Sequence, residues 1–183
     1  PVSTFIGDED GTMPLGTTAW EKRGIATRLP VWDATACIQC NRCSFVCPHA
    51  VIRPYLLDEA ETAAAPDGFV TVPAKGVKGL QFSLQISDMD CTGCGSCVAS
   101  CPMNGKALRM ERVDRELKLT EEWEYGLTIT EKNAFRAETV KGSQFRQPLC
   151  EFSGACAGCG ETPYAKLLTQ LYGDRMYWAN ATG

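Results

Sequence analysis

The stretch CIQCNRCSFVCP at residues 37–48 is followed 54 positions later by CTGCGSCVASCP at residues 91–102. Both stretches follow the pattern C-x2-C-x2-C-x3-C-P, and an internal repeat of this kind predicts two similar units that face one another. Gaps of two residues allow three thiolates of one loop to reach three corners of a single cubane cluster. The fourth cysteine follows a short helical turn that points away, so it reaches the cluster of the other unit.

The repeat therefore predicts two [4Fe–4S] clusters whose fourth ligands are exchanged. The expected ligands are Cys37, Cys40, Cys43 and Cys101 for the first cluster, and Cys91, Cys94, Cys97 and Cys47 for the second. Gly93 and Gly95 allow the backbone to approach the second cluster and to aim N–H groups at its sulfurs. Pro48 and Pro102 end the two turns, because proline lacks the N–H that would continue a helix.

The total of eleven cysteines argues against other uses of the thiols. An odd number cannot pair fully into disulfides, and secreted disulfide scaffolds are usually much shorter than 183 residues. A structural zinc module that only mediates assembly is the second alternative, although a zinc site normally closes with two pairs of ligands. We therefore expect the thiols to serve as iron ligands in a reducing compartment, which indicates a cytoplasmic protein.

Composition and charge exclude several partners. The net charge is −4, and lysine and arginine are scattered without a basic run that would indicate nucleic acid. No apolar stretch approaches the roughly 18 residues that span a bilayer, and the first residues do not have the pattern of a secretion signal. We expect neither a nucleic-acid partner nor a membrane partner.

The pattern along the chain predicts an α+β protein with the bacterial-type 2[4Fe–4S] ferredoxin fold, a pseudo-twofold βαβ repeat. Apolar alternation favours strands at residues 25–31, 69–72, 80–86 and 107–113. The expected organisation is a lead-in at residues 1–30, a two-cluster ferredoxin domain at 31–113, a connecting segment at 114–145 and the start of a further domain at 146–183. Glu61 and the acidic pair at 121–122 are expected on a solvated surface.

The last forty residues differ from the rest. Thr162 and Pro163 are typical of a helix start, and Gly173 is expected to end that helix in a left-handed conformation. Residues 176–179 then favour a buried strand. A helix followed by a strand indicates the truncated start of an α/β domain.

A third cysteine group, Cys156 and Cys159, forms a C-x-x-C loop before that helix, whose N-terminus favours thiolates. Two sulfurs do not complete a cluster, so a third cluster, a zinc half-site, a redox pair and two packed thiols all stay open. Cys150 is interpreted as a spectator thiol. His49, the only histidine, follows the first repeat directly, and either a tuning role or an ordinary hydrogen-bonded side chain fits.

With these motifs placed, the chain resembles an internal piece of pyruvate:ferredoxin oxidoreductase. The resemblance lies in GT at residues 11–12, GTT at 16–18, EKRGIA at 21–26, VWD at 31–33, CPHA at 47–50 and IRP at 52–54. The long insertion between the two cysteine runs also matches, whereas simple ferredoxins lack these flanks.

The resemblance implies that Cys156 and Cys159 are two ligands of a proximal [4Fe–4S] cluster beside thiamine diphosphate, and that Glu161 contacts this cofactor. Residues 173–176 and 179–183 resemble the segment that leads to the third cysteine of that cluster. The residues from 146 onward would then begin a thiamine-diphosphate-binding domain.

The implied parent enzyme is a homodimer that converts pyruvate and coenzyme A to acetyl-CoA and CO2 with thiamine diphosphate and Mg²⁺. Its electrons go to ferredoxin or flavodoxin. The piece alone is not expected to be catalytic, and the rest of the parent is its first partner. A related enzyme for another 2-oxoacid, one that delivers electrons to NADP, and a free ferredoxin are the alternatives.

Overall fold

The computed structural model describes residues 3, 6–7, 10–11 and 16–179. The expected lead-in therefore lies partly outside the described residues, as does most of the segment at 179–183. Within the described lead-in, the short 3₁₀ helix η2 covers Thr17–Trp20. In the described part of the chain, no helix has the length and apolar character that a membrane crossing needs.

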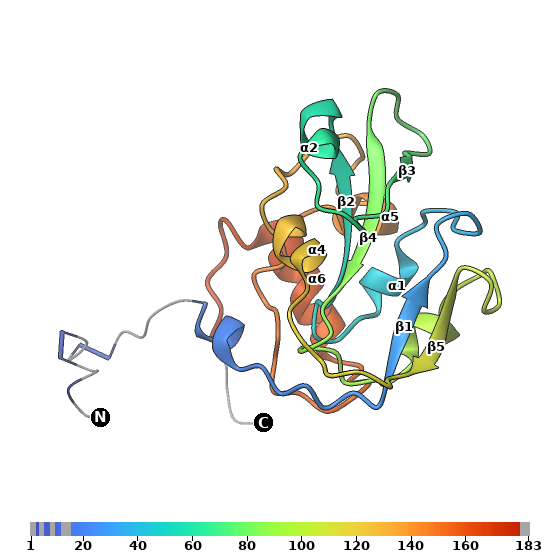
Figure 1. The fold of residues 1–183 in the computed structure, drawn as a ribbon. Coiled ribbons are helices and arrows are strands. Elements are labelled where there is room, and N and C mark those ends of the chain that lie inside the picture. Colours follow the sequence, from blue (N-terminus) through green and yellow to red (C-terminus); the bar gives the residue numbers. More distant parts are fainter. Residues whose placement is uncertain (1–2, 4–5, 8–9, 12–15, 180–183) are drawn as a thin grey trace.

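Two βαβ units form the centre of the fold. The first consists of β1 (Arg28–Trp32), α1 (Arg42–Phe45) and β2 (Ile52–Leu57), and the second of β4 (Gln81–Ile86), α3 (Ser96–Ala99) and β5 (Leu108–Arg112). Each unit completes the sheet of the other, because β1 pairs antiparallel with β5 and β2 pairs antiparallel with β4 (Figure 1). Exchanging the two units therefore maps each strand pair onto the other. This arrangement agrees with a small α+β protein of the ferredoxin type.

The strand β2 is absent from the sequence-based expectation. Arg53 and Pro54 interrupt its apolar pattern, although Ile52, Leu56 and Leu57 are almost fully buried. Proline is tolerated because β2 lies at the edge of the sheet ordered β2-β4-β3 and pairs on one side only. The edge position therefore explains how a proline-containing segment still forms a six-residue strand.

The strand expected at residues 69–72 is mostly wrong. Only Val72–Pro73 pairs with β4, as the short strand β3. Phe69 is buried instead against the ring of Tyr125, with the ring centroids 5.2 Å apart. The strands expected at 25–31, 80–86 and 107–113 are present as β1, β4 and β5, with shifted ends.

The connecting segment contains two short helices, α4 (Glu121–Gly126) and α5 (Val140–Ser143). Trp123 of α4 is 2% exposed and belongs to the same core as β2 and β4. The Arg53 guanidinium lies 5.6 Å from the ring centroids of both Trp123 and Phe152. The residues after β5 therefore complete the core that the strands begin.

Glu61 is not a solvated surface carboxylate, contrary to expectation. It belongs to α2 (Glu59–Ala63), where it forms a capping box with Asp58. The Glu61 carboxylate also accepts hydrogen bonds from Lys132 and from the backbone and hydroxyl of Thr130. Burial alone would raise the pKa of Glu61, but these hydrogen bonds lower it to about 2. The sequence pattern missed this contact because its partners lie about 70 residues away.

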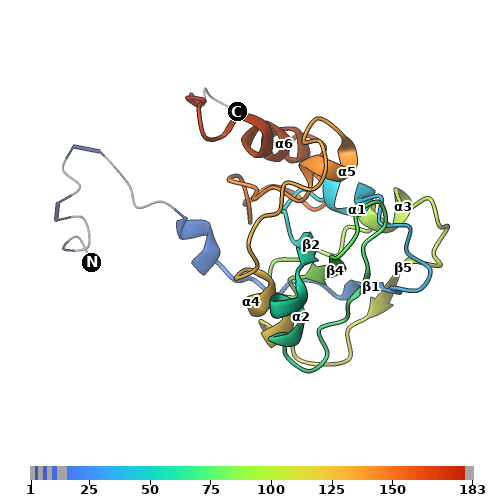
Figure 2. The ribbon, with the colours of Figure 1, turned by 90° about the horizontal axis from the view of Figure 1, so that it is seen from above.

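The helix α6 (Thr162–Tyr172) lies beside α5, on the opposite side of the strands from α2 and α4 (Figure 2). The expected Thr162 cap is wrong by one position, because Glu161 is the N-cap and no side chain caps the helix. Gly173 ends α6 with a right-handed φ of −58°, not a left-handed one. A Cβ at Gly173 would lie 2.4 Å from the Thr169 carbonyl oxygen, so the glycine is needed for space.

The strand expected at residues 176–179 is not present. These residues are irregular, Tyr177 is fully exposed and Trp178 is more than half exposed. A strand needs a partner for its backbone groups, and in the described part of the chain no strand lies beside this segment. Of the helix and strand that were expected to begin an α/β domain, only the helix, α6, is present in the described residues.

Candidate iron–sulfur centres

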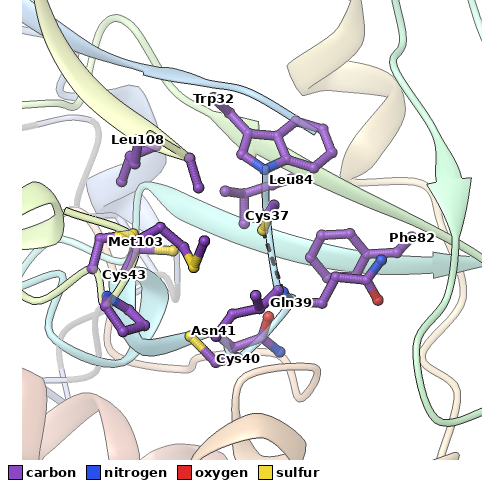
Figure 3. A pocket seen from close by; sticks show the side chains of 14 residues that line it. Trp32, Cys37, Gln39, Cys40, Asn41, Cys43, Phe82, Leu84, Met103 and Leu108 are labelled. Carbon is purple, nitrogen blue, oxygen red and sulfur yellow. Dashed lines mark hydrogen bonds between the residues drawn. The ribbon is translucent and has the colours of Figure 1, made fainter. Parts of the chain in front are cut away.

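Two cavities each contain four cysteines. The first is lined by Cys37, Cys40, Cys43 and Cys101 (Figure 3), and the second by Cys47, Cys91, Cys94 and Cys97. Each set combines three cysteines of one run with the last cysteine of the other run. The structure thus brings together the same two sets of four that the spacing predicts, and ligation of clusters by them stays a prediction.

The exchange follows from the two short helices. Cys43 lies within α1 and Cys97 within α3, whereas Cys47 and Cys101 follow the ends of these helices. Because α1 and α3 pack against each other, the residue that leaves one helix enters the cavity of the other unit.

The cluster-facing loop of the second run is built on glycines, as expected. Gly93 and Gly95 have φ values of 69° and 78°, a left-handed region that glycine enters without a steric penalty. The N–H of Gly93 donates to the Cys91 sulfur at 3.4 Å. A Cβ on Gly93 would also lie 3.1 Å from the Arg28 carbonyl oxygen, so a larger residue would crowd β1.

The first run uses Gln39 and Asn41 at the equivalent positions, with φ values of 59° and 60°. Such values are unfavourable for residues with a Cβ unless other contacts hold them. Here the Gln39 amide donates to the Pro73 carbonyl at 2.9 Å, and the Asn41 amide donates to the Lys141 carbonyl at 2.9 Å. The Gln39 N–H still reaches the Cys37 sulfur at 3.3 Å. Sequence reasoning missed both residues because these partners are distant in the chain.

The cavities are apolar surroundings for thiols. Burial, reinforced by neighbouring sulfurs, raises the pKa of Cys97 to about 12, and burial also raises the pKa of Cys43 and Cys91. A buried thiolate is stabilised when bound iron supplies a compensating positive charge. The cavities therefore suit thiols that are held as metal ligands.

The donor set fits iron–sulfur clusters better than single ions. Four soft sulfur ligands and N–H···S hydrogen bonds are typical of [4Fe–4S] sites. Among the residues that the structure describes, no group of three or more histidine, cysteine or carboxylate side chains is arranged to hold a single metal ion.

The Cys156–Cys159 loop lies next to the second cavity. A Cβ on Gly158 would lie 3.6 Å from the Cys94 Cβ and 3.6 Å from the Ser96 Oγ. Hydrogen bonds from the backbone of Thr162 and Glu161 at the start of α6 lower the pKa of Cys159. Cys156 is exposed. The loop thus presents two thiols at the surface, close to the second set of cysteines.

The remaining candidates occupy different positions. Cys150 lines neither cavity, and its N–H donates to the Thr169 hydroxyl at 3.2 Å. Glu161 is exposed at the start of α6. His49 is 2% exposed, and its Nδ1 lies 3.1 Å from the Ser153 carbonyl oxygen. Burial lowers the pKa of His49, which favours the neutral imidazole.

One buried residue near the cysteines has no counterpart in the sequence-based expectation. Lys166 of α6 is 1% exposed, and its ammonium group reaches the turn between Cys43 and Cys47. Burial lowers the pKa of Lys166 to about 8, an effect that the Cys47 sulfur opposes. Sequence reasoning assigned Lys166 no role, because its hydrogen-bond partners lie about 120 residues earlier in the chain.

Comparison with known proteins agrees with this architecture. Residues 36–105 match a family described as a 4Fe-4S dicluster domain, and residues 1–26 match a family described as a domain of unknown function. The chain is 60% identical to the pyruvate-flavodoxin oxidoreductase of Klebsiella pneumoniae and 58% identical to the pyruvate:ferredoxin oxidoreductase of Moorella thermoacetica. It is 54% identical to the NADP(+) pyruvate dehydrogenase of Cryptosporidium parvum.

All of this chain is covered in these three comparisons, but it spans only 16%, 16% and 10% of the length of the respective relatives. The high identity confirms the resemblance inferred from the motifs. The chain therefore carries a 4Fe–4S dicluster domain and corresponds, over its whole length, to a segment of proteins named pyruvate:ferredoxin or pyruvate-flavodoxin oxidoreductase.

Proposed function

We propose that this chain is the electron-transfer part of an oxidoreductase that converts pyruvate and coenzyme A to acetyl-CoA and CO2. The observation that carries the proposal is the pair of cavities, each lined by three cysteines of one run and the fourth of the other. In this proposal the first cavity holds one [4Fe–4S] cluster on Cys37, Cys40, Cys43 and Cys101, and the second holds another on Cys91, Cys94, Cys97 and Cys47. A bound [4Fe–4S] cluster supplies a site that accepts and releases one electron.

The residues of the chain perform no bond chemistry in this proposal. The thiolates hold the metal, the Gln39 and Gly93 N–H groups donate to sulfurs, and the apolar side chains exclude water. Burial and N–H···S bonds both influence the potential of such a centre. The protein thus acts by positioning two centres and by tuning their potentials.

A third centre would lie on the side of the second cavity. We assign Cys156 and Cys159 as two ligands of a further [4Fe–4S] cluster, completed by cysteines outside this chain. The 3.6 Å approach of Gly158 to Cys94 supports this, because it places the loop beside the second set of thiols. Glu161 would contact thiamine diphosphate, whose Mg²⁺ and other ligands belong to the rest of the parent. The segment at 146–183 would then begin the thiamine-diphosphate domain, after the lead-in (1–30), ferredoxin domain (31–113) and connection (114–145).

The acceptor would dock at the first cavity. Ile38, between Cys37 and Cys40, is 44% exposed. The Lys75 ammonium, from the segment between β3 and β4, contacts this loop by donating to the Cys37 carbonyl oxygen at 2.8 Å. The Lys141 ammonium donates to the Lys75 carbonyl at 2.6 Å. Two lysines beside an exposed cluster loop suit an acidic carrier, and the names of the relatives indicate ferredoxin or flavodoxin. The parent would be a cytoplasmic homodimer.

A second acceptor deserves a direct test, because one relative at 54% identity is named for NADP(+). Pyruvate-dependent reduction of flavodoxin, ferredoxin and NADP by the full-length parent distinguishes these acceptors. Reduction of NADP alone would contradict the proposed carrier, and turnover of another 2-oxoacid in place of pyruvate would contradict the proposed substrate.

Metal content tests the centre of the proposal. The 183-residue chain, purified without oxygen, is expected to contain about eight irons and about eight labile sulfides and to be brown. A colourless protein with zinc and no sulfide would overturn the iron–sulfur assignment and support a structural zinc module.

A further inference from the structure

A buried ammonium group joins α6 to the turn that carries one cysteine of each cavity. The Lys166 Nζ donates to the carbonyls of Ser44, Phe45 and Cys47, the last two at 3.2 Å. These carbonyls stand at and just after the end of α1, where the last carbonyls of a helix lack partners within the helix, although the Ser44 carbonyl also accepts from the Cys47 N–H at 3.1 Å. A lysine has three N–H donors and no acceptor, so three carbonyls satisfy the ammonium completely.

Lys166 is a buried cation whose partners, among the described residues, are carbonyls and not carboxylates. In the described part of the chain, no aspartate or glutamate forms an ion pair with its ammonium group. A buried cation is costly unless a negative charge lies nearby. The sulfurs of Cys47, Cys43 and Cys150 favour the charged form of Lys166 electrostatically, whereas the Arg53 charge opposes it. Cys43 lines the first cavity and Cys47 the second, so the Lys166 ammonium interacts electrostatically with one thiol of each set.

A chain of buried amides fixes α6 in this position. The Ser44 hydroxyl donates to the Gln144 side-chain oxygen at 3.0 Å, and the Gln144 amide donates to Gln170 at 3.0 Å. The Gln170 amide donates in turn to the Arg146 carbonyl at 2.9 Å. These side chains of α1, α6 and the end of α5 are all nearly buried. The helix α6 is therefore also joined to α1 by a network that does not include Lys166.

We propose that Lys166 is a positioning residue for both centres: it holds the turn between Cys43 and Cys47 and raises the potential of each cluster by its positive charge. Reduction adds a negative charge to a cluster, and a fixed cation that contacts the backbone of a cluster ligand, as the Lys166 ammonium contacts the Cys47 carbonyl, stabilises that charge in a low-dielectric interior. The inference rests on the proposed binding of two clusters. It goes further by naming a residue outside the cysteine runs that acts on both.

The test is a redox titration of the cluster-loaded 183-residue chain, followed by electron paramagnetic resonance without oxygen. Lys166→Gln keeps N–H donors and removes the charge, and Lys166→Met removes both. We expect full iron content and a reduced-to-oxidised ratio about tenfold lower at each cluster for a given potential, which equals about 59 mV for a one-electron couple. Unchanged potentials in loaded variants would overturn the role, as would a shift at only one cluster.

Two further variants separate charge from packing. Gln170→Leu breaks the amide network but keeps the ammonium, so its melting temperature should fall while both potentials stay near the wild-type values. An equal fall of the potentials in Gln170→Leu would show that packing explains the effect and would overturn the proposal.

Lys166→Arg keeps the positive charge and covers the case in which uncharged variants do not load clusters. If only Lys166→Arg, among the three Lys166 variants, binds clusters, the positive charge is needed and the proposal is supported. If none of the three binds clusters, the side chain is needed for its shape and the proposal is overturned. Absence of iron in the wild-type chain would instead contradict the proposed function itself.

Discussion

The exchange of ligands between the two cysteine runs is the sharpest prediction, and Cys101→Ala tests it. Cys101 is close in sequence to Cys97, yet it lines the cavity of Cys37, Cys40 and Cys43. Removal of this thiol should therefore damage the cluster of the first run. The cluster of the second run should survive although the substitution lies within that run.

The expected magnitude follows from the two sets of four. Seven of the eight cysteines in the cavities remain after the substitution. The three that remain in the first cavity should lose their cluster, and the four in the second cavity should keep theirs. Iron should fall from about eight per chain to about four if the cluster is lost, or to about seven if a three-iron centre persists. Either value leaves the second centre intact.

Alkylation under native, oxygen-free conditions shows which centre was damaged. Cysteines that hold a cluster are protected from iodoacetamide, and digestion followed by mass spectrometry locates the labelled ones. In Cys101→Ala we expect labels on Cys37, Cys40 and Cys43, with exposed Cys156 labelled in every sample as a reference.

Two controls complete the experiment. Cys150→Ala should leave both cavities protected, because Cys150 lines neither. Cys47→Ala should give the mirror result, with labels on the second run only. Labels on Cys91, Cys94 and Cys97 in Cys101→Ala, with the first run still protected, would refute the exchanged assignment.

Three other substitutions test contacts outside the two cavities, and a fourth serves as a control. Glu61→Gln should lower the unfolding free energy by about 1–2 kcal/mol at pH 7, discounted for partial solvation. Because folding lowers the pKa of Glu61 to about 2, the loss of unfolding free energy in the variant should have its full size above about pH 4.5 and should shrink as the pH falls toward 2. Equal differences in urea midpoint between the two proteins at pH 7 and pH 3 would contradict this prediction. Gly142→Ala places a Cβ 1.9 Å from the Arg136 carbonyl oxygen and should cost about 2 kcal/mol or more, whereas Gly160→Ala, with no atom within 4 Å, should change the melting temperature little. Lys75→Glu should slow reduction of an acidic acceptor about 3–10-fold at low salt, and a rate that does not depend on ionic strength in either protein would argue against docking at this loop.

Several parts of the fold could not be read from local patterns. Strand β2 contains a proline that its edge position tolerates. Residues 176–179 have the apolar character of a strand, but no strand of the described residues lies beside them. Glu61 resembles a surface carboxylate until Lys132 and Thr130 are brought to it from about 70 residues away. In each case the deciding contact is a partner that the sequence does not place nearby.

The sequence by itself determined the two sets of four cysteines that the structure brings together, because the reach of a thiol within a C-x2-C-x2-C loop is a property of a few consecutive residues. It also determined the resemblance to a segment of pyruvate oxidoreductases. Only the tertiary structure decided what surrounds the sulfurs: the amides that hold Gln39 and Asn41 at positive φ, and the Lys166 ammonium that lies 122 positions from Ser44 in sequence. The physical reason is that a buried polar group needs partners with good geometry, and folding supplies these partners from any part of the chain.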